Sequence, residues 1–154
     1  MPEYTIAKSK EEFEAAAILF LEYANWLQVD LCFQSFDKEL QTLDKMYASE
    51  NGGIVLCKLG DEFIGCSAIR RIDTDICELK RMWVKPGHQN KGIGVGLLKE
   101  CIQLAEKLKY KCIRLDTLER LAAAIHLYKK HGFVETAPYY FNPEKEVVYM
   151  EKEL

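Results

Sequence analysis

Three glycines at alternate positions introduce an apolar run in the second half of the chain. The stretch is HQNKGIGVGLL, residues 88–98, and the residues after it keep the spacing of an amphipathic helix. Glycine is a poor helix former, so its repetition at a helix start indicates that a partner must approach the backbone closely. A helix N-terminus carries free N–H groups and a partial positive charge, and both favour an anion. The stretch therefore predicts a phosphate-binding loop between a strand and a helix.

Two familiar nucleotide-binding loops do not fit this stretch. A Walker loop needs Gly-Lys-Ser/Thr after its second glycine, and no such tripeptide follows here. The Rossmann fingerprint needs the spacing GxGxxG, whereas these glycines stand at 92, 94 and 96. An ATP loop and an NAD loop are therefore disfavoured, and a glycine-rich turn without a ligand stays as the alternative.

The composition is that of one globular domain. The 154 residues are 49% apolar and 29% charged, a balance typical of proteins with a buried core. A formal net charge of -3 gives no general attraction to nucleic acid or to an anionic membrane. The first residues lack a secretory signal pattern, and no apolar run approaches the roughly 20 residues of a membrane span. We expect one domain over residues 1–154, cytoplasmic, with no nucleic-acid or membrane partner.

Cysteine and histidine give no sign of a metal site. The six cysteines contain no CxxC pair, and the three histidines show no ligand spacing to them. In a reducing compartment we expect the cysteines to be buried free thiols that pack as small apolar side chains. They are Cys32, Cys57, Cys66, Cys77, Cys101 and Cys112.

Hydrophobic periodicity and turn residues predict a mixed sheet flanked by helices, an α/β fold of the α+β kind. Strands are predicted over residues 4–7, 53–59, 62–72, 76–84, 112–117 and 147–154. Helices are predicted over residues 11–27, 36–43, 95–108 and 121–130. In the strand over 76–84 the alternation breaks between Leu79 and Met82. We expect a β-bulge there, because one inserted residue switches the two faces.

Three segments resemble one protein family. Residues 89–94, QNKGIG, are similar to the Gln/Arg-x-x-Gly-x-Gly/Ala signature of the GNAT superfamily of N-acetyltransferases, which binds the pyrophosphate of acetyl-coenzyme A. ICELKRMWVKP before this segment and AAIHLYKKHGF after it resemble two further family segments, so the likeness spans residues 76–133. The resemblance implies a mostly antiparallel sheet with a splayed central strand pair. It also implies direct acetyl transfer from acetyl-coenzyme A to a primary amine in a ternary complex, without a metal.

The resemblance also implies a coenzyme site. The backbone of the strand before the loop would pair with pantetheine, one N–H would face the thioester carbonyl, and the loop would hold the pyrophosphate. The residues so implied are Met82, Trp83, Val84, Gln89, Asn90, Lys91, Gly92, Ile93, Gly94, Val95, Ala124 and Leu127. Trp83 is alternatively ordinary core, and Lys129 or Lys130 is a candidate for an outer phosphate. Leu121 departs from the family pattern, since many members carry there an Asn that bonds the coenzyme.

Acetyl transfer to an amine needs a proton acceptor, because an alkyl ammonium has a pKa of about 10 and is mostly charged at neutral pH. Glu78, on the strand before the loop, is the first candidate; the alternative is a surface charge paired with Lys80 or Arg81. Asp116 is a weaker candidate that would alternatively cap a turn. Tyr128 stands at the position of the family's general acid, the group that protonates the coenzyme sulfur. Its alternative role is packing on the sheet.

The acceptor is open among small amines and peptide amines. In the family the first helices and the terminal strands shape its pocket, which here points to residues 30–36 and 137–143. Their aromatic residues either line an apolar or cation-binding pocket or pack in the core; they are Phe33, Phe36, Tyr139, Tyr140 and Phe141. Two alternatives remain: an acyl-coenzyme A sensing module without turnover, and an acyl chain longer than acetyl. The resemblance further implies a homodimer through the terminal strands, where an edge strand is available for pairing. His126 is expected at the surface.

Overall fold

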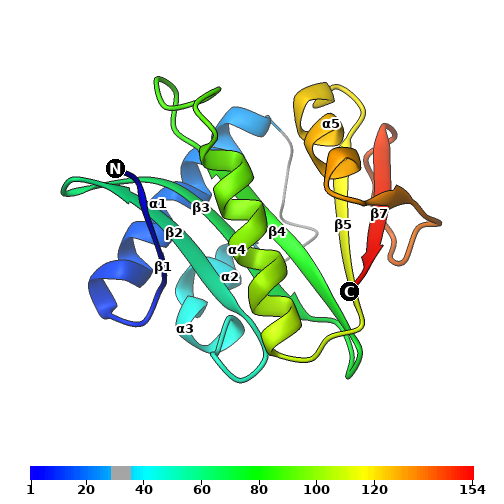
Figure 1. The fold of residues 1–154 in the computed structure, drawn as a ribbon, viewed down its shortest axis with the longest axis horizontal. Helices are drawn as coiled ribbons and strands as arrows, with labels where there is room; N and C mark the ends of the chain where they lie inside the picture. Colours follow the sequence, from blue (N-terminus) through cyan, green and yellow to red (C-terminus); the bar gives the residue numbers. More distant parts are fainter. Residues whose placement is uncertain (29–35) are drawn as a thin grey trace.

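The computed structural model describes residues 1–28 and 36–154, which form a seven-stranded sheet (Figure 1). In chain order the strands are β1 (Glu3–Ile6), β2 (Gly53–Leu59), β3 (Glu62–Arg71), β4 (Ile76–Val84), β5 (Cys112–Leu118), β6 (Val134–Glu135) and β7 (Val147–Glu153). Their order across the sheet is β1-β2-β3-β4-β5-β7-β6. The pair of β4 and β5 is parallel and the other neighbouring pairs are antiparallel. The mixed, mostly antiparallel sheet is thus confirmed, and the short β6 is an addition that periodicity did not predict.

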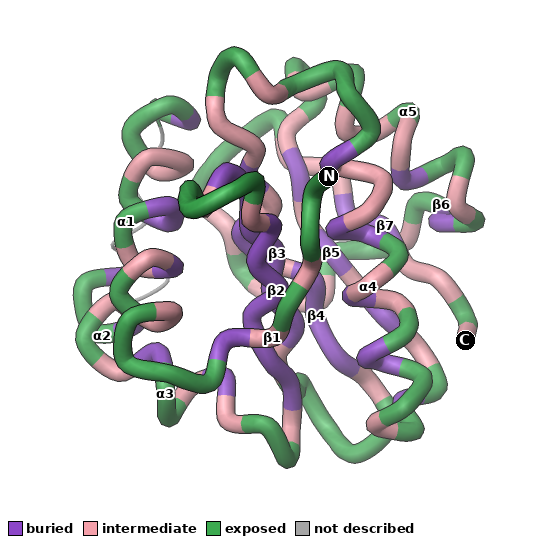
Figure 2. Tube along the Cα trace, turned by 60° about the vertical axis from the view of Figure 1, so that its left-hand side comes forward, coloured by how far each residue is buried: buried purple, intermediate pink, exposed green. Residues whose placement is uncertain are grey.

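Helices cover both faces of the sheet. They are α1 (Lys10–Leu27), α2 (Phe36–Gln41), α3 (Leu43–Met46), α4 (Ile93–Lys107) and α5 (Ala122–Lys130). Figure 2 shows α1, α2 and α3 on one side of the buried strands and α4 on the other. Each side has its own apolar core, one packed under α1 to α3 and one packed under α4 and α5. The strands between them contribute buried side chains to both layers, as expected for a sheet covered on two faces.

Local capping explains where the N-terminal helix begins. The Ser9 hydroxyl accepts a hydrogen bond from the Glu12 N–H, and the Glu12 carboxylate accepts one from the Ser9 N–H. This capping box satisfies two N–H groups that a helix start leaves unpaired. The predicted single helix over 36–43 is wrong in detail, because the chain forms two short helices there. Thr42 between them has a non-helical φ of -133°, and its hydroxyl bonds the Lys38 carbonyl oxygen.

The predicted β-bulge is present in β4. Cys66 of β3 pairs with Trp83, and Ala68 pairs with Lys80, so two steps along β3 correspond to three along β4. Arg81 at this irregularity has a φ of +58°, a left-handed conformation that is rare for a residue with a side chain. The bulge accounts for the broken alternation of apolar residues, because the strand changes face at this point.

The two central strands separate after a short parallel pairing. Residues 76–78 of β4 pair with residues 112–114 of β5. Beyond Glu78 the pairing stops, and Figure 1 shows β4 and β5 diverging from that end. The splayed strand pair implied by the family resemblance is therefore confirmed, and among the described residues one edge of residues 79–84 has no strand partner.

The described cysteines behave as predicted. Cys57, Cys66, Cys77 and Cys101 are buried free thiols, and Cys112 is a partly buried free thiol. Cys32 lies outside the described residues. Across residues 1–28 and 36–154, we find no helix whose length and apolar character would let it cross a membrane.

Candidate active site

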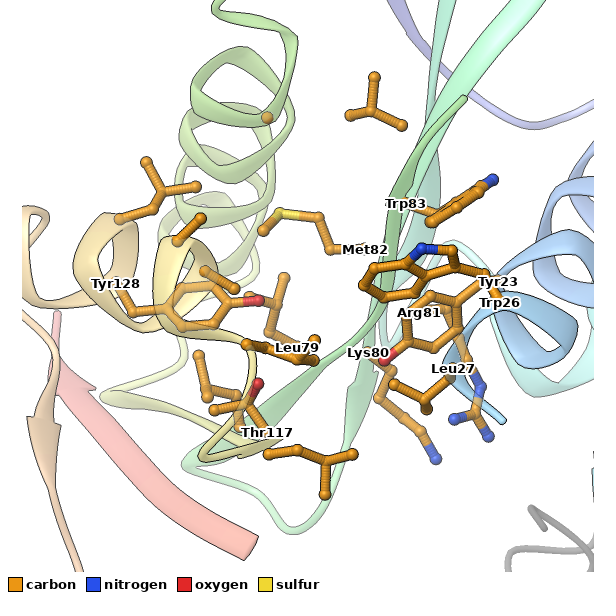
Figure 3. A pocket seen from close by; sticks show the side chains of 18 of the residues that line it. Tyr23, Trp26, Leu27, Leu79, Lys80, Arg81, Met82, Trp83, Thr117 and Tyr128 are labelled. Atoms are coloured by element: carbon orange, nitrogen blue, oxygen red, sulfur yellow. The ribbon is translucent and has the colours of Figure 1, made fainter. Parts of the chain in front are cut away.

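A cavity of about 570 Å³ lies where β4 and β5 part, a size typical of a small-molecule site (Figure 3). Its walls come from residues 79–84 of β4, residues 115–118 of β5, the start of α4, the helix α5 and the C-terminal part of α1. The predicted site residues that line it are Met82, Trp83, Val84, Gln89, Asn90, Gly92, Gly94, Val95, Ala124, Leu127 and Tyr128. Three predicted site residues are not in its lining: Glu78, Lys91 and Ile93.

The glycine loop meets the cavity at the start of α4. Gly92 is the N-cap of that helix with a φ of +82°, and no side chain of residues 1–28 or 36–154 caps the helix there. A Cβ on Gly94 would meet only the Leu127 side chain, at 3.8 Å, so the backbone is open on the side of the cavity. The Gln89 side-chain amide donates to the Val84 carbonyl oxygen at 2.9 Å and ties the loop to β4. Free N–H groups and open space thus coincide where an anion was predicted.

Gly96 has a different role from its neighbours. A Cβ at this position would overlap the Tyr4 hydroxyl of β1, on the packed side of α4. The sequence interpretation that all three glycines clear a binding surface is therefore wrong for Gly96, whose missing side chain makes room for Tyr4. Periodicity did not indicate this, because Tyr4 and Gly96 meet only in the folded chain.

A buried ion pair holds the bulge of β4. The Arg81 guanidinium bonds both oxygens of Glu39 in α2, at 2.9 and 3.0 Å, and the Tyr47 hydroxyl also donates to Glu39 at 3.0 Å. Burial favours a raised pKa for Glu39, but the hydrogen bonds and charge of Arg81 outweigh it and lower the pKa below its ordinary 4.5. The guanidinium also lies over the Phe36 ring, 5.2 Å from its centre.

This ion pair corrects one sequence alternative and reveals a group that sequence reasoning missed. Arg81 was a candidate partner of Glu78, but it pairs with Glu39. Glu39 is fully buried. The sequence signal that could have indicated its role is an acidic residue at a core-facing position of a short helix, because such residues are rarely buried without a partner. The pair fixes the segment whose backbone the family resemblance assigns to the coenzyme.

Tyr128 of α5 reaches into the cavity. Its side chain is buried, its ring centre lies 5.7 Å from that of Phe133, and Figure 3 shows its hydroxyl on the cavity side, toward Met82. Burial raises the pKa of the phenol well above its ordinary value, so the hydroxyl keeps its proton and is available as a donor.

Glu78 lies beside the cavity wall, with both carboxylate oxygens engaged. Oε1 accepts from Arg70 Nε at 3.2 Å and lies 3.8 Å from Lys80 Nζ. Oε2 accepts from the Tyr139 hydroxyl at 2.7 Å. The predicted alternative of a charge paired with Lys80 is therefore present, although the pair is buried and not at the surface.

Asp116 lies at the cavity, on β5. Its Oδ2 accepts hydrogen bonds from the Tyr140 hydroxyl at 2.7 Å and from Asn142 Nδ2 at 3.4 Å. Burial raises its pKa, a shift that Glu78 increases and that the hydrogen bond from Tyr140 opposes. Lys80 lines the same cavity, and burial lowers its pKa to about 8.

Aromatic side chains form the wall opposite Tyr128 (Figure 3). Trp83 has its ring centre 5.1 Å from that of Trp26 and 6.2 Å from that of Tyr23. Trp83 is buried in the core under α1 and also lines the cavity; its role toward the coenzyme stays a prediction. Tyr23 and Trp26 were not predicted, because their contribution depends on α1 crossing the open end of β4.

The remaining candidates fall on several parts of the molecule. Of the predicted acceptor aromatics, Tyr139 and Tyr140 hold the two carboxylates and Phe141 is 83% exposed. Phe36 is buried and Phe33 is not among the described residues.

Ile93 packs in the core under α4, and the side chains at the surface are Lys91, His126, Lys129 and Lys130. Leu121 is the N-cap residue of α5 and lines the cavity without a capping side chain.

Comparisons with known proteins agree with this geometry. The model of the acetyltransferase (GNAT) family matches residues 20–133. An uncharacterized N-acetyltransferase of Schizosaccharomyces pombe is 38% identical over 151 residues, which cover 96% of this chain and 91% of that protein. A crystal structure of an acetyltransferase from Streptococcus agalactiae has a TM-score of 0.82 at 18% identity, covering 99% of this chain and 98% of that one.

One further solved structure holds a ligand. A GNAT family acetyltransferase from Elizabethkingia anophelis, with acetyl-CoA bound, has a TM-score of 0.67 at 22% identity and covers 99% of this chain and 98% of that one. The solved structures share the fold, and the family model covers most of this chain. The chain therefore belongs to the GNAT family of acetyltransferases.

Proposed function

We propose that this protein moves the acetyl group of acetyl-coenzyme A to a primary amine by direct transfer in a ternary complex. The observation that carries the proposal is the cavity at the parting of β4 and β5, which joins an uncapped helix start, an unpaired strand edge and a buried phenol. The named N-acetyltransferase relative and the acetyl-CoA bound by the Elizabethkingia protein support it. The acceptor class is a small-molecule or peptide amine.

The residues present fit the coenzyme. The free N–H groups at the start of α4, with Gly92 and Gly94, suit the pyrophosphate because a side chain at Gly94 would occupy the open space. The unpaired edge of Met82 and Val84 suits the amide groups of pantetheine, which would supply the missing strand partner. The coenzyme contributes the activated thioester. The remaining chemistry falls to the side chains around it.

We assign to Tyr128 the role of protonating the leaving sulfur of the coenzyme. A thiol has a pKa of about 8.5, so its thiolate leaves with modest help, and a hydrogen bond from a protonated phenol stabilises it. The amine must be neutral to attack the carbonyl carbon. The cavity holds donor and acceptor together, which removes much of the entropy cost of their meeting. The cytoplasmic location and the homodimer stay predictions from the sequence.

Calorimetric titration with acetyl-coenzyme A tests the proposal, with NAD and ATP as controls. We expect selective binding of acetyl-coenzyme A, and then release of free coenzyme A thiol when primary amines are added. Selective binding without thiol release for any amine would favour the acyl-coenzyme A sensing alternative. Folded protein that binds none of the three would contradict the proposal.

A further inference from the structure

A buried carboxylate, Glu78, and a partly buried one, Asp116, lie at the parting of β4 and β5, and the proposed reaction needs one proton acceptor. Both Glu78 oxygens are engaged, by Arg70 and Lys80 on one side and by Tyr139 on the other. Glu78 also does not line the cavity. A carboxylate held in this way positions its neighbours well, but it lies outside the lining of the space that a substrate would occupy.

Asp116 has the opposite arrangement. It lines the cavity, and both of its side-chain hydrogen bonds end on Oδ2. Within residues 1–28 and 36–154, no hydrogen bond to its Oδ1 is formed. The bonds from Tyr140 and Asn142 hold the carboxylate in place, while one oxygen remains available to a bound molecule. A proton acceptor must lie within hydrogen-bonding reach of the proton that it takes, and Asp116, unlike Glu78, lines the cavity.

We propose that Asp116, rather than Glu78, takes the proton from the acceptor amine. The inference rests on the proposed acetyl transfer and assigns the acceptor end of the same cavity. Tyr140 and Asn142, from the segment before β7, then serve as positioning residues, because they act through their hydrogen bonds to Asp116.

The electrostatic surroundings are consistent with this role. Burial is the main influence on Asp116 and raises its pKa, which makes its carboxylate a stronger base than an exposed one. The hydrogen bond from Tyr140 acts against this shift, Glu78 adds to it, and the cations of β4 oppose it. Several groups shift the pKa of Asp116 or have their own pKa shifted by its charge. They are Tyr23 of α1; Glu78, Lys80 and Arg81 of β4; Tyr128 of α5; Tyr139 and Tyr140 before β7; and Tyr149 of β7.

The acceptor enters as an ammonium, R–NH₃⁺, and gives one proton to Asp116. The nitrogen lone pair forms a C–N bond to the thioester carbonyl carbon, and the C–S bond breaks with its electron pair on sulfur. The sulfur takes the proton of the Tyr128 hydroxyl, and the second proton, which the nitrogen loses as the amide forms, returns to the Tyr128 oxygen. The products are the acetamide, coenzyme A thiol and the proton that Asp116 releases to solvent.

The reaction rates with two small nucleophiles distinguish a residue that accepts the substrate proton from a residue with a structural role. Methylamine is protonated at neutral pH and needs a base, whereas hydroxylamine is largely unprotonated and does not. We compare Asp116→Asn and Glu78→Gln with the native protein, measuring release of coenzyme A thiol with each nucleophile. Because general base catalysis contributes about 10²- to 10⁴-fold, we expect Asp116→Asn to lower the methylamine rate at least about 100-fold. The hydroxylamine rate should fall by a much smaller factor.

The matched variant and the binding control decide the outcome. Glu78→Gln should change the rates with both nucleophiles by a similar factor, and Asp116→Asn should keep the acetyl-coenzyme A affinity of the native protein. Equal losses of Asp116→Asn with both nucleophiles would overturn the inference, as would a selective loss of methylamine transfer in Glu78→Gln. A native protein that binds acetyl-coenzyme A but transfers to neither nucleophile would overturn the proposed transferase activity, and this inference with it.

Discussion

The two ends of β4 differ in what holds them. At residues 76–78 the strand is paired on one side with β3 and on the other with β5. At residues 82–84 it is paired with β3 alone, after a bulge at Arg81, and its other edge meets a cavity. The closed end contributes the regular hydrogen bonding of a sheet. The open end leaves backbone groups unpaired, and these become binding groups when a ligand supplies the missing partners.

The open end is held by side chains that do not themselves need to touch a ligand. Arg81 and Glu39 connect the bulge to α2, and Gln89 connects the end of β4 to the glycine loop. A strand edge without a neighbouring strand is thereby kept in a defined place. Loss of the residues that hold the open end should therefore destabilise the fold, whereas loss of the residues that face the cavity should stop the chemistry.

The largest effect is expected from Arg81→Met. The substitution leaves Glu39 as a buried carboxylate without its cation, which costs about 3–5 kcal/mol of unfolding free energy. Denaturant unfolding followed by circular dichroism measures the loss. Arg81→Met combined with Glu39→Leu should recover part of it, because no charge is then left buried. A single variant as stable as the native protein would show that the pair does not hold the bulge.

Tyr128→Phe should lower turnover about 100-fold, the lower range for loss of a proton-transferring group, and leave acetyl-coenzyme A affinity nearly unchanged. Steady-state thiol release and calorimetry give the two quantities. The matched control is Tyr110→Phe, which removes a hydroxyl that donates to the Asn51 carbonyl oxygen outside the cavity lining. This control should lose about 1 kcal/mol of stability and keep its turnover. Normal turnover in Tyr128→Phe would remove the phenol from the reaction.

The glycines of α4 should respond in opposite ways to the same substitution. Gly94→Ala places a methyl group in open space, so we expect slightly higher stability, up to about 1 kcal/mol, and about tenfold weaker acetyl-coenzyme A binding. Gly96→Ala forces a methyl group against Tyr4, so we expect about 1–3 kcal/mol lower stability and little change in affinity. Adding Tyr4→Ala to Gly96→Ala should relieve the overlap. Thermal unfolding and calorimetry on the same samples measure the two quantities. Equal losses of acetyl-coenzyme A affinity in Gly94→Ala and Gly96→Ala would contradict this assignment.

The smallest effect concerns pH. The pKa of Glu39 is lower in the folded protein than its ordinary 4.5, so its ionisation stabilises the fold above that value. This contribution is lost as the pH falls below about 4.5 and through the folded pKa. Urea unfolding over that acidic range should show a steeper loss of stability for the native protein than for Glu39→Gln. Identical slopes would mean that the Glu39 pKa is not lowered by folding.

Local signals in the sequence were sufficient for most of the fold. The apolar spacing of residues 11–27 marks α1, the apolar runs over 53–59 and 62–72 mark β2 and β3, and the broken alternation before Met82 marks the bulge. Each of these depends on residues close together in the chain. The break at Thr42 and the two-residue strand β6 were missed, because pairing and packing of distant segments decide them.

The sequence predicted several residues that line the cavity, but not the contacts among their side chains. The glycine loop and Tyr128 were found because they belong to contiguous motifs that end at the cavity. The partnership of Arg81 with Glu39 spans 42 residues, and Asp116 meets Tyr140 from another part of the chain. Periodicity assigns a residue to a face of its own element, but it does not give the partner that the fold brings to that face.

The most direct test of the difference between the two ends of β4 is an NMR titration of ¹⁵N-labelled protein with acetyl-coenzyme A, which follows the backbone amides one by one. The account predicts large shifts for residues 82–84 and 92–95, at the open end and the glycine loop. Residues 76–78 and 112–114, at the closed end, should shift little. Shifts concentrated at the closed end, or absent from the glycine loop when the coenzyme is bound, would contradict the claim that the parting of β4 and β5 is the coenzyme site.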